Sequence, residues 1–110
     1  MFTNQPKFTF FVNSHLIGES ILISQKILII NKLGLHARAA AKFVTVAGQF
    51  ESDIQLKRAT RAVNGKSIMG IMLLAASKGT ELEIIIDGND EDQAMQQLIQ
   101  LVENKFDESE

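Results

Sequence analysis

The sequence predicts an α+β domain in which a four-stranded antiparallel sheet carries three helices on one face. Three observations predict it. The chain has 110 residues, which suits one compact domain, and 45% of them are hydrophobic. Segments with a two-residue apolar period also alternate with segments of helical period. The element order is β-α-β-β-α-β-α, which is typical of a two-layer arrangement.

The domain is expected over residues 24–106. Residues 1–23 differ from the rest, since they contain Pro6, the only proline, and four of the seven phenylalanines, without a clear period. We interpret them as an N-terminal extension of uncertain structure, in which FTFF could form a short strand. Residues 107–110 form an acidic tail that we expect to be frayed.

The first elements are a strand and a helix. The run KILII at 26–30 is rich in Ile and predicts a strand. The helix is expected over 36–48, with Gly48 at its C-terminal cap. Its apolar residues recur at i, i+3, i+4 and i+7, namely Ala40, Phe43, Val44 and Ala47.

The next elements are two strands and a second helix. Polar and apolar residues alternate over 52–57, which predicts a half-buried strand, and 61–65 predicts a short one after a turn at Ala59 and Thr60. The segment 67–76 predicts a helix with Ser67 as its N-cap.

The last two elements follow a short loop. ELEIIID at 81–87 predicts a strand, and Asp90 is expected to cap the final helix. One apolar stripe along that helix comprises Ala94, Leu98, Leu101, Val102 and Phe106.

Composition excludes several functions. The net charge is −2, so the basic footprint of a nucleic-acid-binding protein is missing. There is no cysteine, which excludes disulfides and thiolate sites, and His15 and His36 are too few for a multi-histidine metal site. No apolar run has the length of a membrane span, and the N-terminal residues lack a signal-peptide pattern. We therefore expect a cytoplasmic protein without membrane insertion.

The segment Gly34-Leu35-His36-Ala37-Arg38 lies where a strand leads into a helix. A helix start has unpaired N–H groups and partial positive charge, so it favours a bound phosphate. The guanidinium of Arg38 matches phosphate oxygens, and Gly34 allows an unusual turn. This combination suits a nucleophilic imidazole at His36 that is reversibly phosphorylated. The alternative is that His36 is only a helix cap or a surface residue.

The helix from Ser67 is apolar on all sides, which a helix in a two-layer domain cannot bury completely. Part of it should be exposed and form a partner site, unless residues 1–23 cover it. The apolar residues are Ile68, Met69, Ile71, Met72, Leu73 and Leu74. Ser67 itself is explained by capping, although the helix start would also tolerate a phosphate there.

Two further features receive structural interpretations. His15, in the irregular extension, is expected to be solvated or structural. The acidic residues near the last helix lack the ligand pattern of a calcium loop, and capping explains them better. They are Asp87, Asp90, Glu91 and Asp92.

Two motifs carry a resemblance to a known family. KLGLHARAAAKFV resembles the active-site signature of HPr proteins, usually Gly-Leu-His-x-Arg-Pro-Ala, and NGKSIMGIMLLAASKG resembles the regulatory-serine segment of that family. The similarity runs from about Ser24 to Phe106 without obvious gaps, with the two motifs at the spacing of the family.

The resemblance implies a phosphocarrier of the phosphoenolpyruvate-dependent phosphotransferase system with an open-faced β-sandwich fold. His36 matches the histidine that enzyme I phosphorylates on Nδ1, and Arg38 matches the arginine that contacts the phosphoryl group. Ser67 matches the serine that HPr kinase/phosphorylase modifies in some lineages. The surface that docks enzyme I and the IIA domains is matched by Ala37, Ala41, Ile68, Met69 and Met72. The resemblance implies a stoichiometric carrier, a monomer without metal or cofactor, and no catalytic turnover of its own.

The sequence departs from the family pattern at one position and leaves three competing hypotheses open. Ala39 replaces the usual proline, and since alanine favours helices, the helix and the histidine chemistry should be kept, with a slightly looser entrance. NKLG and SKG also resemble the nitrogen-related branch, NPr, which feeds a regulatory phosphorelay instead of sugar uptake. The chain could also be a binding module that works without phosphorylation, or a structural domain without any site.

Overall fold

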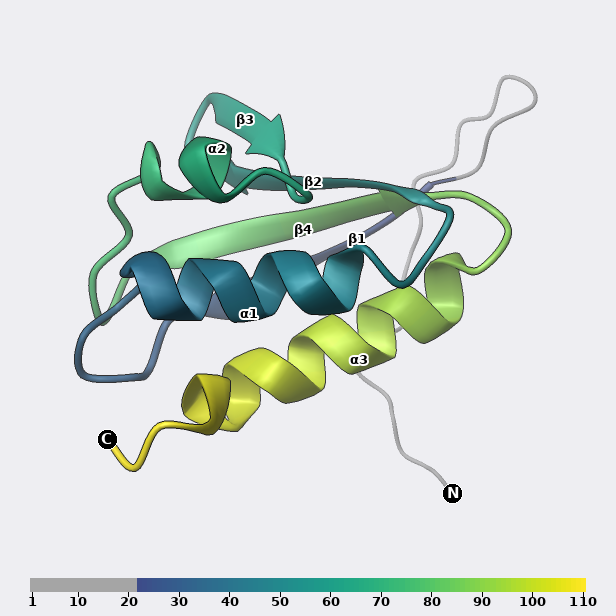
Figure 1. The fold of residues 1–110 in the computed structure, drawn as a ribbon. Coiled ribbons are helices and arrows are strands. Elements are labelled where there is room, and N and C mark those ends of the chain that lie inside the picture. The colour runs from purple at the N-terminus through teal and green to yellow at the C-terminus, as the bar shows by residue number, and fades with distance from the viewer. Residues whose placement is uncertain (1–21) are drawn as a thin grey trace.

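The computed structural model describes residues 22–110 and contains one four-stranded sheet (Figure 1). The strand order is β1-β4-β2-β3, and every neighbouring pair is antiparallel. The strands are β1 Ile23–Leu28, β2 Asp53–Arg58, β3 Arg61–Asn64 and β4 Glu81–Asp87. The expectations for FTFF and His15 lie outside the described residues.

Three helices lie on one face of the sheet, with α1 and α3 side by side in front of it (Figure 1). They are α1 Ala37–Ala47, α2 Ile68–Met72 and α3 Glu91–Glu103. The predicted fold class is therefore confirmed. Alternate strand residues fill the layer between sheet and helices, among them Ile54, Leu56, Leu82, Ile84 and Ile86, and they meet helical side chains such as Phe43 and Leu98.

Strand β1 begins earlier than the apolar run predicts. Strand pairing starts at Ile23, which lies opposite Ile86, whereas the prediction was 26–30. The polar residues Ser24 and Gln25 belong to the strand because β4 offers them a partner backbone. Beyond the strand, Ile29 is buried and its N–H still donates to the carbonyl of Thr80 at 3.0 Å.

Helix α2 is shorter than predicted, since it ends at Met72 and not at residue 76. The chain turns after it through a positive φ of 49° at Ala75. The guanidinium of Arg58 donates to the carbonyls of Leu74 and Ala75 at 2.7 and 3.0 Å, which satisfies acceptors that a longer helix would pair internally. The apolar residues after Met72 therefore belong to a capped turn and not to a continuation of the helix.

The C-terminal end of α3 also differs from the prediction. The helix ends at Glu103, and Phe106 lies in the short 3-10 turn η2, Lys105–Asp107, with a positive φ of 56°. Phe106 is fully buried, as the apolar stripe predicted, but a reversal of the chain places it there. The same reversal directs the last residues back toward the loop before α1 (Figure 1).

Asp90 occupies the N-cap position of α3, as predicted, but its side chain makes no cap hydrogen bond. Its carboxylate accepts instead from the Ser52 hydroxyl at 2.5 Å and from the N–H groups of Ser52 and Glu51 at 3.0 and 2.8 Å. The hydrogen bond from the Ser52 hydroxyl, with those N–H groups, lowers the pKa of Asp90. Asp90 thus ties the start of β2 to the start of α3.

Candidate functional site

The loop before α1 depends on a glycine that lies two residues before His36. Gly34 has a φ of +70°, which only glycine adopts without cost. A Cβ atom there would lie 2.6 Å from the carbonyl oxygen of Ala76, so the two loops touch through backbone atoms. The N–H of Leu35 donates to that same carbonyl at 2.9 Å. The glycine of the motif is therefore required both by backbone conformation and by space.

His36 is the N-cap residue of α1, with extended backbone at φ −75° and ψ 179°. Its carbonyl accepts from the N–H of Ala40 at 2.9 Å, which begins the helix. Its side chain makes no cap hydrogen bond. The ring is half-buried, with 30% of the side chain exposed. His36 therefore occupies the helix-cap position that the alternative names, but its side chain does not satisfy the helix N–H groups.

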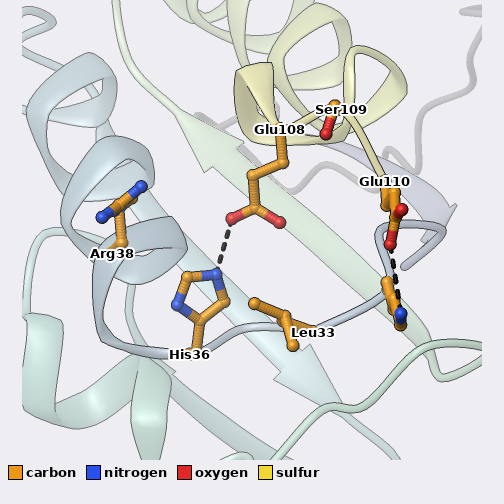
Figure 2. A pocket seen from close by; sticks show the side chains of 7 residues that line it. Leu33, His36, Arg38, Glu108, Ser109 and Glu110 are labelled. Atoms are coloured by element: carbon orange, nitrogen blue, oxygen red, sulfur yellow. Dashed lines mark hydrogen bonds and ion pairs between the residues drawn. The ribbon is translucent and has the colours of Figure 1, made fainter.

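The imidazole of His36 pairs with a carboxylate from the opposite end of the chain. Its Nε2 lies 2.5 Å from Oε2 of Glu108 (Figure 2). The second oxygen of Glu108 accepts from Nδ2 of Asn31 at 3.0 Å. The side chain of Glu108 is 15% exposed. Burial raises the pKa of this carboxyl, but the hydrogen bonds from Asn31 and His36 outweigh it and hold the pKa below its ordinary value of 4.5.

The C-terminal residues lie over the loop and are fixed at several points. The N–H of Lys32 donates to the carbonyl of Glu110 at 2.7 Å, and its ammonium pairs with the Glu110 carboxylate at 3.1 Å. Lys42 of α1 donates to the carbonyl of Phe106 at 2.9 Å. The expectation of a frayed tail is therefore wrong. Lys32, Lys42 and the buried Phe106 anchor the acidic tail, which its composition alone predicted to be solvated.

Tail and loop enclose an open depression of about 570 Å³ beside the imidazole (Figure 2). The nitrogen of His36 that is not bound to Glu108 faces the side on which Arg38 lies (Figure 2). Among the described residues, none forms a salt bridge with the exposed Arg38. The lining residues are Lys32, Leu33, His36, Arg38, Glu108, Ser109 and Glu110.

Ser67 is the N-cap of α2, and its hydroxyl accepts from the N–H of Gly70 at 3.0 Å. The predicted capping role is confirmed. The predicted partial exposure of this helix is also confirmed, since Ile71 is buried whereas four apolar neighbours face outward. These four, which we call the α2 patch, are Ile68, Met69, Met72 and Leu73, with exposed fractions of 40%, 78%, 43% and 64%.

The remaining site residues predicted from the sequence lie on α1. Ala37 is exposed and Ala41 is half-buried, and α1 packs against α2. Ala39, which stands where the resemblance leads us to expect proline, is completely buried in the first turn of α1.

Sequence reasoning missed Glu108 and Asn31. Asn31 is fully buried, and its amide also donates to the carbonyl of Gly34 at 2.8 Å. Within residues 22–110, no group of three or more histidine or acidic side chains could hold a metal ion. In the same part of the chain, each helix is too short or too polar to cross a membrane.

The half-buried histidine at the start of α1 agrees with the arrangement that the resemblance to phosphocarrier proteins implies, and comparison with known proteins gives the same class. The family model for the PTS HPr component phosphorylation site matches residues 23–104. The phosphocarrier protein HPr of Pseudomonas aeruginosa is 54% identical over 86 residues, which is 77% of this chain and 96% of that protein. The chain belongs to the HPr family of the phosphotransferase system.

Solved structures agree with this assignment. The crystal structure of HPr-C-His from Thermoanaerobacter tengcongensis matches with a TM-score of 0.77 and 45% identity, and covers 79% of this chain and 98% of its own. An HPr dimer from the same organism matches with a TM-score of 0.64 and 48% identity over 74% of this chain and 94% of its own. The family-level predictions of phosphocarrier function and HPr-like fold are thus confirmed.

Proposed function

We propose that His36 is the phosphorylated residue, and that it accepts a phosphoryl group from phospho-enzyme I and donates it to IIA domains. The observation that carries this proposal is the start of α1. The side chain of His36 is not used as a cap there, and the guanidinium of Arg38, two residues on, is exposed (Figure 2). A phosphoryl group on Nδ1 would therefore meet both the N–H groups of the helix start and a guanidinium.

The transfer follows from these groups. The lone pair on Nδ1 of His36 attacks phosphorus, and the P–N bond to the histidine of the donor breaks, with its electron pair returning to that nitrogen. Charge on the transferring oxygens is stabilised by Arg38 and by the first N–H groups of α1. The protein is regenerated only when an acceptor takes the phosphoryl group, so it acts as a stoichiometric carrier.

We also propose that partners dock on the α2 patch together with Ala37 and Ala41 of α1. The support is the exposure of Met69 in α2 at 78% and of Leu73, its C-cap, at 64%, because α2 packs against α1, which begins directly after His36. Flexible methionine side chains suit a surface that must accept enzyme I and several IIA domains in turn. This surface would lie next to the phosphorylated histidine in each complex.

Ser67 is proposed as a regulatory site. Its hydroxyl is half-buried at the edge of the α2 patch, directly before Ile68. A phosphate there would place about two negative charges beside an apolar docking surface, and would weaken the binding of enzyme I. HPr kinase/phosphorylase would be the modifying enzyme.

The setting of the protein completes the proposal. We place the folded carrier at residues 24–106, with 1–23 as an extension and 107–110 as an acidic tail that lies on the domain. We propose a cytoplasmic monomer. Since an HPr from Thermoanaerobacter tengcongensis is described as a dimer, sedimentation of the full chain tests the monomer directly.

The experiment is transfer from labelled phosphoenolpyruvate through enzyme I to the full chain and to its His36→Ala variant. We expect acid-labile label on the wild type and none on the variant. Label on His36→Ala would contradict the assignment of the site. The same variant tests the hypothesis of a binding module, because a module that works without phosphorylation would keep its effect on a partner when His36 is removed.

A further inference from the structure

We propose that Glu108 is a positioning residue for phosphoryl transfer, which fixes the proton of the imidazole on Nε2 and leaves the lone pair on Nδ1 of His36. The proposal rests on the proposed function, in which Nδ1 is the nucleophile. It adds a residue from the far end of the chain, outside both motifs that identify the family.

The direction of the hydrogen bond sets the tautomer. The pKa of Glu108 lies below its ordinary value of 4.5, so the carboxyl is ionised near neutral pH and can only accept hydrogen bonds. At 2.5 Å from this carboxylate, Nε2 of His36 must donate. A neutral imidazole has one N–H, and therefore its Nδ1 carries a lone pair.

The carboxylate is itself held in place. Its other oxygen accepts from Asn31, whose amide nitrogen also donates to the carbonyl of Gly34, at 3.0 and 2.8 Å. Asn31 is fully buried, so its orientation is set by the loop that precedes α1. Phe106, also fully buried, anchors the chain two residues before Glu108. The carboxylate is thus held beside the imidazole by Asn31, before α1, and by Phe106, after α3.

The same contact stabilises the phosphorylated ring. When Nδ1 forms its bond to phosphorus and the donor histidine leaves, the ring of His36 gains positive charge while its proton stays on Nε2. The carboxylate of Glu108 faces that proton and opposes the charge. On donation to an acceptor, the P–N bond breaks, the electron pair returns to Nδ1, and the hydrogen bond to Glu108 is unchanged. No further reactant is needed.

The alternative is that Glu108 only anchors the tail. A tail anchor would leave the position of the imidazole proton unaffected, and a neutral amide could replace it. The two roles separate in the Glu108→Gln variant. The amide of Asn31 needs an acceptor, so the oxygen of the introduced glutamine side chain should turn toward Asn31 and its NH2 group toward Nε2 of His36. The proton would then move to Nδ1 and block the nucleophile.

The test uses the full chain with ¹⁵N-labelled histidine, as wild type, Glu108→Gln and Glu108→Ala. Long-range ¹H–¹⁵N spectra at alkaline pH report which nitrogen carries the proton, with the His36→Ala spectrum to assign the signals. We expect Nε2–H in the wild type, mainly Nδ1–H in Glu108→Gln, and a mixture in Glu108→Ala. The matched control is Glu103→Gln, exposed on α3 outside the depression, which removes the same charge and should keep Nε2–H.

Transfer from enzyme I is measured on the same proteins. Loss of a hydrogen bond between charged groups should slow phosphorylation of Glu108→Gln by about ten- to hundredfold, with the control unchanged. An unaltered tautomer in Glu108→Gln and Glu108→Ala would overturn the proposal, whatever the rates. If the wild type took no phosphate, the proposed function would fail, but the tautomer spectra would still decide the role of Glu108.

Discussion

The starts of α1 and α2 differ in what their first residue does with its side chain. At α2, the hydroxyl of Ser67 accepts from the N–H of Gly70 and satisfies its own helix. At α1, His36 makes no such bond, and its ring pairs instead with Glu108, 72 residues along the chain. One helix start is closed by a local cap, and the other is left open toward solvent and flanked by Arg38.

The two N-cap residues therefore have different roles, because Ser67 stabilises its helix and His36 does not. A serine cap contributes about 1 kcal/mol to stability. The start of α1 forgoes that contribution, and its N–H groups stay available for an anion. A chain selected only for stability would have a Ser, Thr, Asp or Asn at position 36. The histidine there is best explained by the chemistry that we propose.

The largest effect is expected at the open helix start. Arg38→Ala should slow phosphorylation of His36 by about 10²- to 10³-fold, because it removes a donor that stabilises the transferring charge. Stopped-flow transfer from phospho-enzyme I measures this rate. Stability should change little, since Arg38 is exposed and alanine favours helices. Transfer at the wild-type rate would show that the helix N–H groups alone suffice.

A smaller effect is expected from adding charge at the closed start. Ser67→Asp should weaken the binding of enzyme I by about tenfold, since a carboxylate would be desolvated at the edge of the α2 patch. Titration calorimetry with enzyme I measures it, and Gln55→Glu, exposed on β2, adds the same charge away from α2 as a control. Unchanged affinity for Ser67→Asp would remove Ser67 from the docking surface.

The fold could be predicted from the sequence, and the residues proposed to react could be selected, because their signals are local. Periodicity identified the four strands and three helices, and the two motifs identified His36, Arg38 and Ser67. The end of α2 could not be predicted in this way, because it depends on a distant residue. Arg58 of β2 donates to the carbonyls of Leu74 and Ala75, which follow the helix. Glu108 was missed for a similar reason, since its role depends on a chain reversal at Phe106 that has no helical period.

Removal of the cap alone should affect stability and leave transfer intact. Ser67→Ala leaves the N–H of Gly70 without its partner and should lower the free energy of unfolding by about 1 kcal/mol. Urea unfolding measures the loss, and the transfer assay should give the wild-type rate. A large loss of transfer in Ser67→Ala would mean that the hydroxyl itself takes part in docking.

The smallest effect is the response of the tail to acid. The pKa of Glu108 is below 4.5 in the folded protein, so its contribution is fully present above about pH 4.5. It is lost as the pH falls through the lower, folded-state value. Amide chemical shifts of residues 106–110 should therefore stay constant from neutral pH down to about 4.5 and change below it. In Glu108→Gln this change should vanish, and a change that persists would show that Glu108 is not the group responsible.

The most direct test of the account is the position of the phosphoryl group on the protein. ³¹P and ¹⁵N spectra of the chain, phosphorylated by enzyme I and phosphoenolpyruvate, distinguish a phosphoryl group on Nδ1 from one on Nε2. We predict phosphorylation of His36 on Nδ1, with Nε2 still protonated and bonded to Glu108. A phosphoryl group on Nε2, or on any residue other than His36, would contradict the account.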